Sequence, residues 1–73
     1  LNIDYDLSKD KKLTIELFDN SGKLVKVLAK NISQKSGKQS YMLNADEMSL
    51  PSGMYYIKFT TPNDSFTKKI LKQ

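Results

Sequence analysis

Strict alternation of apolar and polar residues is the feature that most limits what this chain can fold into. The pattern recurs in residues 3–7, 13–17, 25–27, 41–43 and 55–59. A period of two places apolar side chains on one face of a strand and polar side chains on the other. A sixth segment, residues 66–72, is less regular, because the adjacent Ile70 and Leu71 would face opposite ways. Six or so short strands predict an all-β sandwich or barrel.

The length and composition exclude most catalytic chemistry. With 73 residues the chain forms one domain and buries roughly 60% of the surface that its unfolded form exposes. It has neither cysteine nor histidine, so it lacks a disulfide, a thiolate and an imidazole ligand or base. We therefore expect no enzyme activity, no cofactor and no metal. No apolar run approaches the ~20 residues of a membrane span, and no signal peptide opens the chain.

Turn signals separate the strands. Asp19-Asn20-Ser21-Gly22 predicts a type I turn closed by a bulge glycine, with the Asp19 side chain accepting bonds from later amides. Pro62-Asn63-Asp64 predicts a second hairpin turn. Residues 31–37 are polar and are expected to form a loop. Residues 44–53 form a longer connection, with one helical turn at 45–48, that is expected to cross from one sheet to the other.

Three candidate sites have too little support. Gly22-Lys23 and Gly37-Lys38 lack the second glycine and the Ser or Thr of a phosphate loop. The 19–22 run has oxygen ligands but no downstream bidentate Glu for calcium. Asp4 and Asp6 lie on the polar face of the first strand, and a core this thin leaves no cleft in which paired carboxylates could act. We interpret all three as turns or solvated charges.

The net charge of +4 raises the possibility of nucleic-acid binding. Every cation is lysine, and the lysines are interleaved with acidic residues. Most aromatic residues in the strands occupy the same alternate positions as the apolar residues, which predicts that their side chains face the core. They are Tyr5, Tyr41, Tyr55 and Phe59. Only Phe18 and Tyr56 occupy the alternate positions that are expected to face solvent. The charge is therefore interpreted as solubilising, and no nucleic-acid partner is expected.

The segment from Leu50 to Ile57 predicts a structural tyrosine. Pro51 and Gly53 break the chain, and Tyr55 then enters a strand at a core-facing position. Such a tyrosine can pack its ring and return its hydroxyl to the loop backbone, as in the tyrosine corner of immunoglobulin-like sandwiches.

Four blocks in order resemble a known family over essentially the whole chain. They are Phe18-Asp19-x-x-Gly22-Lys23-x-Val25, a polar loop with Gly37, the 50–57 segment and the basic ending Thr67-Lys68-Lys69-Ile70-Leu71-Lys72. Together they resemble the type A C-terminal sorting domains of the type IX secretion system. The resemblance implies a single domain, residues 1–73, with a small immunoglobulin-like antiparallel sandwich of six or seven strands. We expect it to be a piece from the C-terminus of a larger secreted protein.

The resemblance also implies a function. Domains of this family direct an attached N-terminal cargo across the outer membrane to the cell surface or the medium. The cargo first reaches the periplasm by a separate N-terminal signal. An outer-membrane translocon then recognises the module, and a sortase-like peptidase removes it in many members. The alternative is an immunoglobulin- or fibronectin-like accessory or adhesion module of an extracellular enzyme.

Carried over by position, the resemblance assigns two sets of residues. The fold-defining set is Asp19, Gly22, Gly37, Pro51, Gly53 and Tyr55. The recognition set is Lys68, Lys69, Ile70, Leu71 and Lys72. Independently of the family, we hypothesise that the last strand is an edge strand that offers backbone groups to a partner strand, while its lysines discourage self-association.

Overall fold

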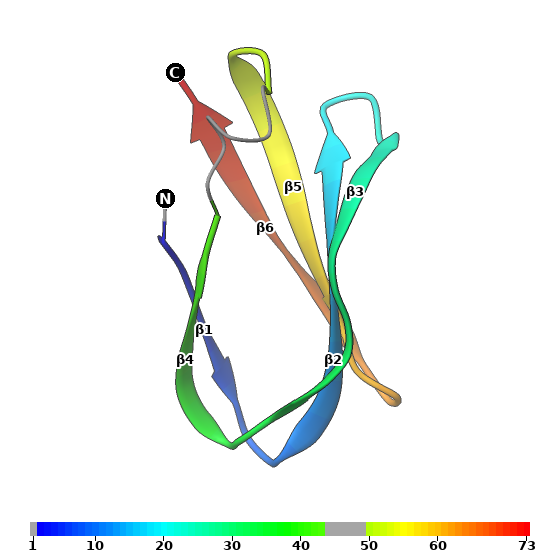
Figure 1. Ribbon diagram of the computed structural model, residues 1–73, viewed down its shortest axis with the longest axis vertical. Coiled ribbons are helices and arrows are strands. Elements are labelled where there is room, and N and C mark those ends of the chain that lie inside the picture. The colour runs from blue at the N-terminus through cyan, green and yellow to red at the C-terminus, as the bar shows by residue number, and fades with distance from the viewer. Residues whose placement is uncertain (1, 44–49) are drawn as a thin grey trace.

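The computed structural model describes residues 2–43 and 50–73, which form antiparallel strands and no helix (Figure 1). The strands are β1 (Asn2–Leu7), β2 (Lys11–Asp19), β3 (Leu24–Gln34), β4 (Gly37–Met42), β5 (Gly53–Thr60) and β6 (Ser65–Lys72). They form a two-stranded sheet, β1-β4, and a four-stranded sheet of order β3-β2-β5-β6. The predicted all-β class is confirmed, and the two sheets are consistent with a small sandwich.

One hydrophobic core lies between the sheets, and the alternating residues supply it. Leu13, Ile15 and Leu17 of β2 are fully buried, as are Ile57 and Phe59 of β5. Among the described residues, the other buried apolar ones are Ile3, Tyr5 and Leu7 of β1, Leu43, Leu50 and Tyr55. Because β2 and β5 are the central strands of the larger sheet, their inner faces have the most complete cover.

An aromatic cluster joins the two sheets. The ring of Phe59 on β5 lies 4.6 Å from that of Tyr5 on β1 and 4.8 Å from that of Phe66 on β6, centroid to centroid. The hydroxyl of Tyr5 donates to the side-chain oxygen of Gln34 at 3.2 Å. The ring contacts place β1 over β5 and β6, and the bond to Gln34 links β1 to the end of β3. On the other side, the Tyr41 hydroxyl of β4 donates to the Leu28 carbonyl oxygen of β3 at 3.3 Å.

Two sequence expectations are wrong, and both concern β3. The expected loop at 31–37 is mostly strand, because β3 continues to Gln34 and β4 begins at Gly37. A register irregularity near Asn31, whose φ is +51°, lets the polar segment remain paired with β2. Val25 and Val27 alternate as a buried strand would, yet they are 40% and 42% exposed.

Two other expectations concern the connection between β4 and β5. Its ends lie in different sheets, so the expected crossing from sheet to sheet is confirmed. The helical turn expected at 45–48 lies outside the described residues.

Candidate functional site

The turn between β2 and β3 is built around the Asp19 side chain. Its Oδ1 atom accepts from the Ser21 amide at 2.9 Å, the Ser21 hydroxyl at 2.6 Å and the Lys23 amide at 3.0 Å. The Gly22 amide donates to the Asp19 carbonyl at 3.0 Å, and the Asp19 amide donates to the Lys23 carbonyl at 3.0 Å. Gly22 has a φ of +87°, which glycine adopts without Cβ strain. The bonds are those of the predicted turn with its bulge glycine.

The Asp19 carboxylate gives the turn a pH dependence. Donation from the Ser21 hydroxyl and the Lys23 amide, together with the nearby Lys23 charge, lowers the pKa of Asp19 below its usual value. A carboxylate whose pKa is lower in the folded state contributes stability above its unfolded pKa, and loses that contribution as the pH falls through the folded pKa. Asp19→Ala should therefore lower the thermal midpoint at pH 7, and the deficit should shrink below about pH 4.

Thermal unfolding of Asp19→Ala and wild type between pH 7 and pH 2 measures this effect. Asn20→Ala, in the same turn and without a titratable group, is the matched control and should show a difference that does not vary with pH. A deficit of constant size for Asp19→Ala would contradict the assignment of the carboxylate to the turn.

The predicted tyrosine corner is present where β5 begins. The Tyr55 side chain is 6% exposed, and its hydroxyl donates to the Pro51 carbonyl oxygen at 2.6 Å. Gly53, with a φ of +149°, lies between the two residues and starts the strand. The bond ties the described end of the β4–β5 connection to the strand that follows it.

The turn and the corner lie at the same end of the sandwich. Asp19 is the register partner of Tyr55, and Gly53 is the register partner of Lys72 at the end of β6. A shallow depression of about 480 Å³ separates residues 19–21 from residues 52–55. The sheet thus brings together all of the sequence-assigned fold residues except Gly37, because β4 begins at the opposite end (Figure 1).

The sequence-assigned recognition residues all lie on β6, an edge strand of the larger sheet. Ile70 is half-buried and packs on the core, whereas Leu71 is 56% exposed. The two adjacent residues face opposite ways, as expected. Lys68 lies on the same face of the strand as Phe66 and Ile70, which is the inner face. Lys69 and Leu71 lie on the outer face. The strand contains no acidic residue.

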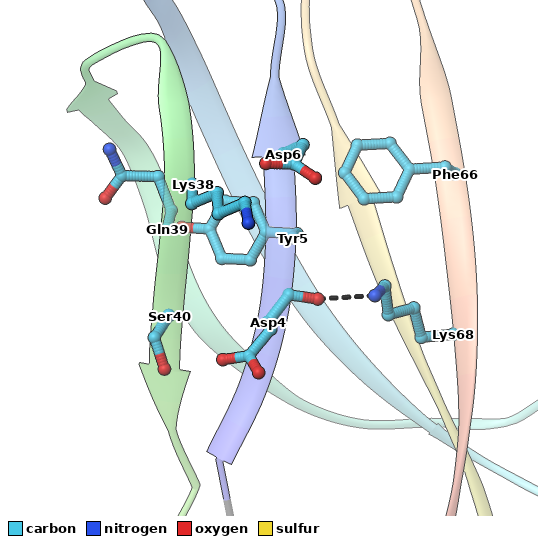
Figure 2. Close-up of a pocket in the computed structure, with 8 residues that line it drawn as sticks. All are labelled: Asp4, Tyr5, Asp6, Lys38, Gln39, Ser40, Phe66 and Lys68. Carbon is cyan, nitrogen blue, oxygen red and sulfur yellow. Dashed lines mark hydrogen bonds between the residues drawn. The ribbon is translucent and has the colours of Figure 1, made fainter.

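Lys68 connects the edges of the two sheets. Figure 2 shows its ammonium reaching from β6 to the carbonyl oxygen of Asp4 on β1, to which it donates a hydrogen bond. An open pocket of about 710 Å³ surrounds this contact, with the rings of Tyr5 and Phe66 as apolar wall. Its other lining residues are Asp6, Lys38, Gln39 and Ser40. The expectation that no cleft lies beside Asp4 and Asp6 is wrong, because both residues line this pocket. The Lys68 contact was not expected either, although a lysine among the core-facing positions of the last strand was a visible signal.

A family model described as a secretion system C-terminal sorting domain matches residues 1–73, the whole chain. The chain belongs to this family. It is a sorting signal for type IX secretion, which implies export to the cell surface or the extracellular space. Neither the comparison with curated proteins nor that with solved structures gives a match. The described part of the sorting domain contains no helix of the length and hydrophobicity that a membrane span requires.

Proposed function

We propose that the sorting domain is a non-catalytic signal at the C-terminus of a secreted cargo. The cargo enters the periplasm by its own N-terminal signal, an outer-membrane translocon recognises the folded domain, and a sortase-like peptidase separates the two. The observation that carries this proposal is the match to the sorting family over the full length. The family resemblance implies the route, and the fold provides a small module with an exposed basic edge strand.

The two assigned residue sets have separate roles in this proposal. Asp19, Gly22, Pro51, Gly53 and Tyr55 hold the end of the sandwich at which β6 finishes, and Gly37 starts β4 at the other end. The recognition set, residues 68–72, is presented by that frame at the edge of the sheet. The hydrogen bonds at Asp19 and Tyr55 support the first role, and the edge position of β6 supports the second.

A fusion experiment tests the function. Residues 1–73 are joined to the C-terminus of a monomeric reporter that carries an N-terminal export signal, in a bacterium with a type IX system. Surface and medium fractions should contain the fused reporter, whereas the reporter without the domain should stay in the periplasm. Cells that lack the translocon should retain both. Equal distribution of the two reporters in wild-type cells would contradict the proposal.

A further inference from the structure

On β6, the backbone N–H and C=O groups of every second residue point to the open edge of the sheet. Thr61 and Asp64, which close the hairpin, exchange both backbone hydrogen bonds, at 2.8 and 3.4 Å. In an antiparallel pair, such hydrogen-bonded partners recur at every second position. The register therefore directs the backbones of Phe66, Lys68 and Ile70 toward β5. The N–H and C=O groups of the alternate residues, Thr67, Lys69 and Leu71, point to the open edge.

The nearby edge of β1 is partly occupied. The Asp4 carbonyl oxygen accepts from Lys68, so this oxygen faces away from β4 and toward β6. It is an acceptor that an added strand would need if it paired with β1. Because Lys68 already uses it, the edge of β6 is the better template for a partner strand, and β6 lengthens the larger of the two sheets.

The side chains around the edge specify the chemistry of the partner. On the outer face, Lys69 favours a carboxylate beside it, and its neighbours on that face, Thr67 and Leu71, carry no negative charge to oppose one. On the inner face, an added strand would direct side chains toward the pocket walled by Tyr5 and Phe66. Asp4 and Asp6 line this pocket together with Lys38 and Lys68, so its charges balance, and the two rings favour an apolar side chain there.

We propose that the open edge of β6 binds an extended acidic and apolar segment of a secretion-system protein, adding it as a fifth strand to the four-stranded sheet. The inference rests on the proposed sorting function and names the kind of partner. Backbone pairing supplies affinity, and the alternation of carboxylate outside with apolar residue inside supplies specificity.

Titration of the isolated 73-residue chain with synthetic peptides tests the inference. The probe is a seven-residue peptide in which glutamate and valine alternate, and the control peptide carries lysine in place of glutamate. Amide chemical-shift changes should be largest at Thr67, Lys69 and Leu71, and the control should bind at least tenfold more weakly. Shift changes centred on β1, or no binding of the glutamate peptide at millimolar concentration, would overturn the inference.

A pair of proline variants tests the register. Lys69→Pro removes an N–H that faces the open edge, so the domain should remain folded while peptide affinity falls at least tenfold. Lys68→Pro removes an N–H that pairs with β5 and should destabilise the fold. Unchanged affinity in a folded Lys69→Pro domain would contradict strand addition. Delivery of the two fusions separates this inference from the sorting function. If the wild-type and the Lys69→Pro cargo both reached the surface normally, strand addition would be contradicted and the sorting function would stand.

Discussion

Replacing Tyr55 with alanine is expected to lower the free energy of unfolding by about 3–4 kcal/mol. The ring is almost fully buried, and its hydroxyl bonds to Pro51, so the substitution removes core packing and leaves a carbonyl without its donor. At about 0.05–0.15 kcal/mol per residue, the whole domain has only about 4–11 kcal/mol of stability. Tyr55→Ala should therefore be largely unfolded at moderate urea, as followed by circular dichroism.

Two further variants separate the ring from the hydroxyl. Tyr55→Phe keeps the ring and should cost about 1 kcal/mol, the usual net value of one hydrogen bond. Tyr56→Phe is the matched control, because Tyr56 is the next residue and lies half-buried on the outer face. It should leave the urea midpoint nearly unchanged. Wild-type stability in Tyr55→Ala would refute the corner as a structural tie.

Deleting Lys69 to Gln73 from a fused cargo is expected to reduce its surface delivery at least tenfold. The deletion removes the end of β6, including the exposed Leu71 and the half-buried Ile70. Delivery is measured by surface labelling of whole cells, with total cargo from lysed cells as reference. Normal surface delivery of the truncated protein would contradict the assignment of the recognition set.

A variant that stays folded distinguishes a loss of recognition from a loss of structure. Lys69→Glu combined with Leu71→Thr changes two side chains on the outer face of β6 and leaves the core intact. It should keep the wild-type circular dichroism spectrum and still deliver several-fold less cargo. The comparison variant is Lys26→Glu with Val27→Thr, two exposed neighbouring residues of β3, the edge strand at the other side of the sheet. This variant should deliver normally.

Alternation predicted the central strands because their environment is simple. Leu13, Ile15 and Ile57 point inward as expected, since β2 and β5 have neighbours on both sides and a second sheet above them. The same pattern failed for Val25 and Val27. A two-stranded layer is too narrow to cover a four-stranded sheet, and bulges in β3 change which side chains face inward. Neither property is present in the local pattern.

The site was predictable only in part, for a related reason. Local chemistry identified the Asp19 turn and the Tyr55 corner, because each depends on residues within five positions of one another. The Lys68 contact joins residues 64 positions apart, and it exists only because the aromatic cluster places β1 over β6. The lysines among residues 67–72 indicated a basic tail. Its open-edge backbone groups followed only from the observed register.

Photo-crosslinking in living cells tests most directly whether β6 is the strand that the secretion machinery contacts. A photoreactive residue is placed in the fused cargo at Leu71 on β6, or at Val25 on β3, two positions that are 56% and 40% exposed on opposite edge strands. If β6 is the contacted strand, position 71 should crosslink to the outer-membrane translocon and position 25 should give few crosslinks. Equal yields, or crosslinks from position 25 alone, would contradict the assignment of β6 as the recognised strand.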